Sequence, residues 1–111
     1  MEAKAYLRDL RITPRKVKIV LDLIRNKPVA TAAAILQNTP KAASEPVLKL
    51  LRSCVANAEN NFGMDVDKLY VKTCFVGPAR VMKRRMERAK GSADIYRKRS
   101  SHITMILAEK E

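Results

Sequence analysis

Apolar residues recur with the period of an α-helix through the first half of the chain. In TPRKVKIVLDLIRNKP, Thr13 and Pro14 suit a helix N-cap and first helical position. Apolar residues then follow at i, i+3, i+4 and i+7: Val17, Val20, Leu21 and Ile24. We expect this amphipathic helix to end at Pro28 and an alanine-rich second helix to run to about Asn38, with Val29, Ala33 and Leu36 on one face.

A third, longer helix is predicted in the middle of the chain. Thr39-Pro40 repeats the N-cap signal, and Gly63 supplies a stop after Asn61. Pro46 is compatible with this helix only in the first turn, so a start near Ser44 is the alternative. Its apolar positions are Val47, Leu51, Cys54, Val55 and Ala58.

After Gly63 the apolar period changes from 3.6 to 2, which is typical of strands. One predicted strand places Leu69, Val71, Thr73 and Phe75 on one face, and a second places Ile103, Met105 and Leu107 together. The opening AKAYLRDL is a weaker third strand. Three helices packed on one face of a small three-stranded antiparallel sheet would bury all these stripes, which predicts a single α+β domain.

Residues 77–101 join the two late strands and do not fit that core. In IYRKRSS, cations occupy both faces of the chain, so neither face can be buried against protein. We therefore predict a globular head, residues 1–76 and 102–111, and a long protruding β-hairpin, residues 77–101. Its turn is expected near Ala89 to Gly91, where Gly91 can adopt a positive φ. A disordered basic loop is the alternative.

The charge distribution supports an interacting hairpin. The 111 residues contain 23 Lys plus Arg and 11 Asp plus Glu, a formal net charge of +12. Residues 77–101 carry nine of these cations and two acids, and residues 1–18 carry six cations and two acids. Such an excess is unfavourable without a polyanion, so nucleic acid or an anionic membrane surface is the expected partner.

The sequence offers little for other classes of protein. It has no apolar run of the ~18 residues that a spanning helix needs, and its charged start is unlike a signal peptide, so we expect a cytosolic protein. Cys54 and Cys74 lack metal-ligand spacing and are expected to be small buried hydrophobes. No nucleophile elbow, phosphate loop or metal cluster accompanies the lone His102, so neither catalysis nor a cofactor is expected. Aromatic residues make up only 5 %, which argues against a base-stacking platform.

Three segments, RITPRKVKIVLDLIRNK, VANAENNFGMDVDKLYV and GPARVMKRRMERAKGSADIYRKRSSHIT, together resemble bacterial large-subunit ribosomal protein twenty-two. The resemblance runs from about Ala5 to Ile106. It implies a structural constituent of the large ribosomal subunit that binds 23S ribosomal RNA, aids subunit assembly, and lines the nascent-peptide exit tunnel with its hairpin. Two positions depart from the family pattern, Glu87 for the usual proline and Ser92 for the usual arginine.

These arguments give two sets of candidate site residues. The expected RNA-binding residues are Arg8, Arg11, Arg15, Lys16, Lys18, Arg80, Lys83, Arg84, Arg85, Arg88, Lys90, Arg97, Lys98, Arg99, Ser101 and His102. The resemblance implies a tunnel-lining tip formed by Met82, Lys83, Arg84, Arg88, Ala89, Lys90 and Gly91. The expected partners are large-subunit RNA, other large-subunit proteins and the passing nascent peptide, with no membrane and no homo-oligomer. The alternative is an architectural DNA-binding protein that inserts a basic β-arm into the minor groove.

Overall fold

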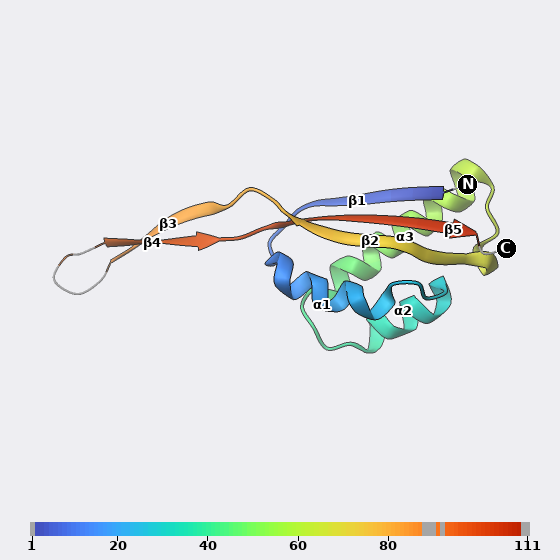
Figure 1. The fold of residues 1–111 in the computed structure, drawn as a ribbon, viewed down its shortest axis with the longest axis horizontal. Coiled ribbons are helices and arrows are strands. Elements are labelled where there is room, and N and C mark those ends of the chain that lie inside the picture. The colour runs from blue at the N-terminus through green and yellow to red at the C-terminus, as the bar shows by residue number, and fades with distance from the viewer. Residues whose placement is uncertain (1, 88–90, 92, 110–111) are drawn as a thin grey trace.

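The computed structural model describes residues 2–87, 91 and 93–109, and it has the predicted α+β architecture (Figure 1). Its helices are α1 (Pro14–Ile24), α2 (Val29–Asn38) and α3 (Ser44–Phe62), followed by a short 3-10 helix at Val66–Lys68. Its strands are β1 (Glu2–Leu10), β2 (Leu69–Pro78), β3 (Met82–Glu87), β4 (Ala93–Lys98) and β5 (Ser101–Glu109).

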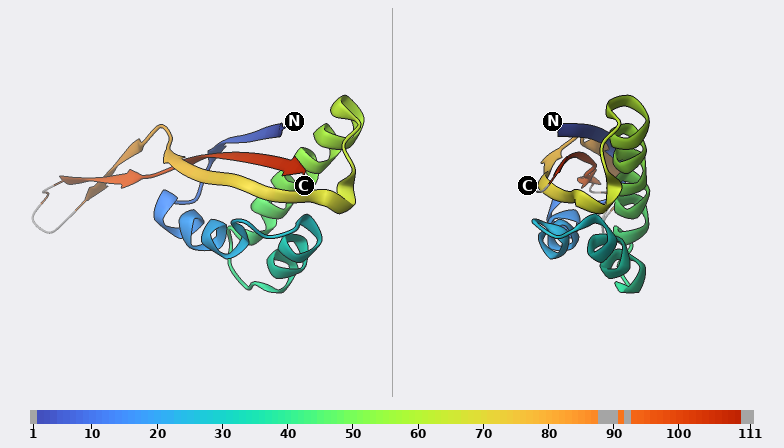
Figure 2. Two further views of the ribbon diagram at one scale, coloured as in Figure 1. Left: turned by 45° about the vertical axis from the view of Figure 1, so that its right-hand side comes forward. Right: turned by 90° about the vertical axis from the view of Figure 1, so that its right-hand side faces the viewer.

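The head is built on an antiparallel sheet with the order β1-β5-β2. The three helices cover one face of it and leave the other face open (Figure 2). Alternate residues of β5, namely Ser101, Ile103, Met105 and Leu107, are buried beneath the helices. The three apolar members, Ile103, Met105 and Leu107, meet Val17, Val20, Leu21 and Ile24 of α1 and Val47, Leu51, Cys54 and Ala58 of α3 in one hydrophobic core.

The predicted alternation of β2 holds only for its first half. Leu69 and Val71 are buried as expected, but the next buried residue is Cys74, and Phe75 is 50 % exposed. The cause is a register shift in the pairing with β5, because Val71 lies opposite Leu107 and Thr73 opposite Ile106, which leaves Lys72 as an extra residue. Such a bulge exchanges the two faces of the strand beyond it. The prediction that Phe75 shares a face with Leu69 is therefore wrong.

The helix boundaries follow the proline and glycine signals more closely than the threonine signals. Thr13 and Pro14 occupy the N-cap and first turn of α1, although the Thr13 side chain makes no capping hydrogen bond. The N-cap predicted at Thr39 is wrong, since its hydroxyl donates to the carbonyl of Ile35 at the end of α2. Helix α3 begins at Ser44 and so keeps Pro46 in its first turn, where no helical hydrogen bond from its nitrogen is required.

The hairpin extends from the head as a separate two-stranded ribbon of β3 and β4. Pairing within the head sheet continues as far as Pro78 and Ser101, slightly beyond the expected limits. The ribbon then pairs Met82 with Lys98 through to Glu87 with Ala93, which gives the molecule extents of 64 × 26 × 17 Å. Gly91 has a φ of 74°, the positive value for which a glycine was expected; Ala89 and Lys90 lie outside the described residues.

Both cysteines are free and buried, which confirms their expected role as small core residues. The Cys54 thiol donates to the carbonyl of Ala3 at 3.3 Å, and the Cys74 thiol lies 3.6 Å from the carbonyl oxygen of Leu21. Burial raises the pKa of Cys54 to about 11 and raises that of Cys74 as well. Both side chains are therefore neutral and poorly nucleophilic at ordinary pH.

Candidate nucleic-acid interface

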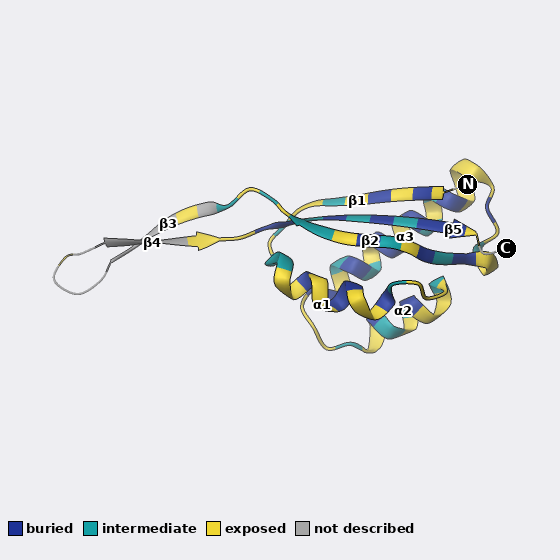
Figure 3. Cartoon of the chain, viewed as in Figure 1, coloured by how far each residue is buried: buried dark blue, intermediate teal, exposed yellow. Residues whose placement is uncertain are grey.

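Five of the predicted cations lie together on the head, and we call them the head patch. They are Arg8 of β1, Arg11 of the following turn, and Arg15, Lys16 and Lys18 of α1. All five are exposed (Figure 3), and for Arg15, Lys16 and Lys18 the reason is that the apolar stripe of α1 faces the sheet and leaves its cationic positions in solvent. Strand β1 ends, and helix α1 begins, at the end of the head from which the ribbon leaves (Figure 1). The head patch and the ribbon are thus neighbouring parts of one basic end.

The ribbon carries the second group of predicted cations. Arg80, Lys83, Arg97, Lys98 and Arg99 are exposed, and Lys83 lies directly opposite Arg97 in the strand pairing. Arg84 and Arg85 are placed by their backbone in β3, whereas Arg88 and Lys90 lie outside the described residues.

The exposed cations have few internal partners. Lys83 aside, the ion pairs among the described residues join Arg25 to Asp22, Lys49 to Glu45, and Lys72 to Glu2. None of them involves Arg80, Arg97, Lys98, Arg99 or the head patch. A polyanion that binds these side chains would therefore not have to displace protein carboxylates from them, so the arrangement suits a nucleic acid.

Ser101 and His102 occupy different positions from the other candidates. Ser101 is fully buried, and its hydroxyl donates to the carbonyl of Ile12, so its side chain has no surface to offer RNA and we remove it from the candidate set. The sequence pattern could have predicted this burial, because Ser101 lies on the same face of the strand as the apolar residues Ile103 and Met105. His102 is half-buried on the opposite face, and its Nδ1 accepts a hydrogen bond from the backbone N–H of Asp9 at 3.1 Å.

The predicted tip lies only partly within the described residues. Met82, Lys83 and Arg84 belong to β3, and Gly91 is described, but Arg88, Ala89 and Lys90 lie outside the described residues, as does Ser92. A role in lining a tunnel stays a prediction.

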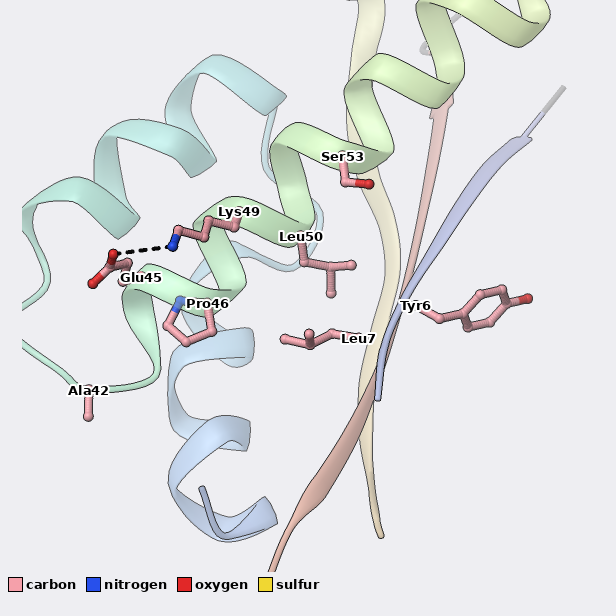
Figure 4. A pocket seen from close by; sticks show the side chains of 8 residues that line it. All are labelled: Tyr6, Leu7, Ala42, Glu45, Pro46, Lys49, Leu50 and Ser53. Atoms are coloured by element: carbon pink, nitrogen blue, oxygen red, sulfur yellow. Dashed lines mark ion pairs between the residues drawn. The ribbon is translucent and has the colours of Figure 1, made fainter. Parts of the chain in front are cut away.

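A groove of about 550 Å³ lies between β1 and the first turns of α3 (Figure 4). Leu7, Pro46 and Leu50 supply much of its lining, and its charged residues are Glu45 and Lys49. Those two side chains pair with each other at 3.5 Å. The groove therefore offers neither a cationic surface nor a set of catalytic groups.

The described part of the chain contains neither a candidate metal site nor a helix able to span a membrane. Among residues 2–87, 91 and 93–109 there is no group of three or more His, Cys, Asp or Glu residues that could hold a metal ion. Within the same residues no helix has the length and apolar character needed to cross a membrane.

Comparison with known proteins gives consistent matches over nearly the whole chain. The family model described as ribosomal protein L22p/L17e matches residues 5–108. The chain is 58 % identical over 109 residues to large ribosomal subunit protein uL22 of Mesoplasma florum, covering 98 % of this chain and 97 % of the relative. It is 54 % identical to the protein of the same name from Pelotomaculum thermopropionicum, covering 100 % of this chain and 98 % of the relative.

Proposed function

Because the chain belongs to the ribosomal protein L22p/L17e family, we propose that it is a structural component of the large ribosomal subunit and binds the RNA of that subunit. Its role is one of binding and not of catalysis. We propose that it acts in the cytoplasm as a single copy within the ribosome, beside other large-subunit proteins. Large-subunit RNA, 23S in bacteria, is the proposed main partner.

One observation carries the RNA-binding part of this proposal. The ribbon extends away from the core, and Arg80, Arg97, Lys98 and Arg99 are exposed on it without an ion pair to any described carboxylate. An isolated two-stranded ribbon is marginally stable in water, and like charges weaken it further. Closely spaced phosphates would neutralise the repulsion between these cations, and the release of counterions from the RNA would favour binding entropically.

The proposed mechanism divides the work between two surfaces. The head patch contacts phosphates and positions the head, while the ribbon enters a region where RNA strands crowd together and displaces their counterions. Bringing several RNA segments to one protein would aid subunit assembly. We also propose that the outer part of the ribbon lines the nascent-peptide exit tunnel and meets the passing peptide; this part is supported by the family resemblance alone.

The backbone pairing at the base of the ribbon suggests a deletion that keeps the two head strands connected. The backbone N–H of Ala79 donates to the carbonyl of Ser100 at 2.9 Å, so the two residues face each other across the ladder. Replacing residues 80–99 by Asn-Gly should close the strands with a two-residue turn. We expect a folded head that binds large-subunit RNA more weakly, with a smaller dependence on salt, and that is lost from the subunit in a high-salt wash.

A charge-reversal pair tests the same idea within the intact chain. Arg84→Glu alters the ribbon, and Arg52→Glu makes the same change on the exposed surface of α3. In a competition for incorporation into large subunits, Arg84→Glu should be the more strongly disfavoured. Equal incorporation of the two variants would contradict the role given to the ribbon, and tighter binding to duplex DNA than to ribosomal RNA would favour the architectural DNA-binding function.

A further inference from the structure

The open face of the head sheet presents two aromatic side chains in one row. Tyr6 of β1 and Phe75 of β2 both lie opposite Thr104 of the central strand β5. Tyr6 is 55 % exposed and Phe75 50 % exposed. Figure 4 shows Tyr6 directed away from the helices, on the side of the sheet opposite Leu7. The bulge at Lys72 brings Phe75 to that same face.

The spacing of the two rings suits two separate planar groups. They stand on strands that flank β5, so their backbones are about 10 Å apart, twice the usual strand separation. Thr104 between them is short, and the next position beyond Phe75 on this face is Gly77, opposite His102. Neither neighbour would cover the faces of the rings.

The charges on this face are arranged unevenly. At one end, Lys72 reaches across β5 to pair with Glu2, and this contact lowers the pKa of Glu2 and raises that of Lys72. Nearer the aromatic row lie Lys4 and Arg8, which share the outward parity of Tyr6 and form no ion pair with a described residue. The Arg8 guanidinium carbon is 5.6 Å from the centre of the Tyr6 ring, within cation–π range. The exposed Asp9 follows in the β1 bulge.

We propose that this open face binds single-stranded ribosomal RNA, with one base stacked on Phe75, another on Tyr6, and the adjoining phosphates held by Lys4 and Arg8. Stacking on aromatic rings and contact with a cationic groove are the two components of single-strand recognition by open sheets. Arg8 also belongs to the head patch, so the face is continuous with the proposed phosphate-binding surface. A protein partner is less well matched, because Thr104 separates the two rings and the cations Lys4 and Arg8 flank Tyr6 along β1, where an interface core would bring apolar groups together.

This inference rests on the proposed function, and it adds base contacts to an interface otherwise made of phosphate contacts. The probe is a fluorescently labelled uridylate octamer, compared with an abasic oligomer of equal phosphate number. Binding to the full chain is measured for Tyr6→Ala and Phe75→Ala at several salt concentrations. Phe62→Ala is the matched control, since Phe62 is 47 % exposed but lies at the end of α3, away from this face.

We expect each of Tyr6→Ala and Phe75→Ala to weaken binding of the octamer about tenfold, the usual scale of one base stack. The slope of log affinity against log salt should stay unchanged, because no phosphate contact is lost. Phe62→Ala should bind as the unmodified chain does, Phe75→Tyr should restore affinity, and the abasic oligomer should bind weakly to all. Thermal unfolding of each variant checks that the head is intact.

Two outcomes would overturn the inference. Octamer binding that is insensitive to both alanine substitutions, or equal affinity for the abasic oligomer, would show that no bases stack on this face. If the ribbon replacement nevertheless weakened binding to large-subunit RNA, the proposed function would hold without this inference. Normal octamer binding by Tyr6→Ala and Phe75→Ala, with loss of a neighbouring protein from reconstituted subunits, would instead assign the face to a protein partner.

Discussion

Three consecutive cations at the base of the ribbon allow the electrostatic mechanism to be tested quantitatively. Arg97, Lys98 and Arg99 are all exposed, and none of them forms an ion pair with a described carboxylate. Changing all three to Gln removes three charges without deleting a backbone hydrogen bond. If each contacts one phosphate, the slope of log affinity against log salt should become less steep by about 2 to 3, from ~0.7 to ~0.9 for each phosphate.

That change in slope predicts a large difference in measured affinity. Between about 50 and 200 mM salt, the unmodified chain should lose roughly 20 to 40 times more of its affinity for large-subunit RNA than the triple variant does. The assay is a filter-binding or anisotropy titration at four or more salt concentrations. The slope is the informative quantity, because a partly unfolded variant would bind less without showing this particular dependence.

A matched variant separates local contacts from the overall charge of the protein. Lys27, Arg52 and Lys68 are also exposed and also unpaired among the described residues, but they lie on the helical side of the head and near the start of β2. Their triple change to Gln lowers the net charge equally and should alter the slope by less than about 1. Equal slopes for the two triple variants would refute the reasoning, since binding would then depend on total charge and not on the ribbon.

Three further predictions concern the head. The Asn-Gly replacement of residues 80–99 should unfold in one cooperative transition by circular dichroism; a molten head would show that the ribbon contributes to the core. Ser101→Ala should destabilise the head by about 1 to 3 kcal/mol in urea titrations, because the Ile12 carbonyl loses its buried donor; no change would show that water replaces it. Since the folded pKa of Cys54 is raised to about 11 from 9.0, the folded state keeps a proton that the unfolded state loses, so stability should fall as pH rises from 9.0 toward 11. This loss, on the order of 2 kcal/mol, should be absent from Cys54→Ala, and identical alkaline profiles would contradict it.

Periodicity predicted the parts of the fold whose pattern is continuous. The stripe of α1 at Val17, Val20, Leu21 and Ile24 is buried in full, and the alternation of β5 gives its two faces without error. Each of these elements keeps one period from end to end. Local pattern and tertiary packing therefore agree, and the sequence is sufficient to predict which face of the element is buried.

Where the period is interrupted, the sequence was not sufficient. Nothing in LYVKTCF marks Lys72 as the extra residue of a bulge, because Thr, Cys and Phe are all compatible with either face. The pairing with β5 decides the phase, and that is a tertiary property. The same limit applied to Thr39, whose side chain completes the end of α2 instead of starting α3. The low aromatic content likewise gave no indication that Tyr6 and Phe75 would meet across a third strand.

The pairing of β5 explains how a marginal ribbon leaves the head in a defined direction. Register shifts occur on both sides of β5, at Lys72 of β2 and between Leu7 and Leu10 of β1, and the pairing of β2 with β5 continues to Pro78 and Ser101. Bulges increase the local right-handed twist, so the head fixes the orientation in which the ribbon strands start. Ser101 anchors that base through its buried bond to Ile12, at the turn that carries Arg11 of the head patch. The ribbon can therefore be weakly stable by itself and still leave the head in a defined direction relative to the head patch, because its base is joined to the head sheet.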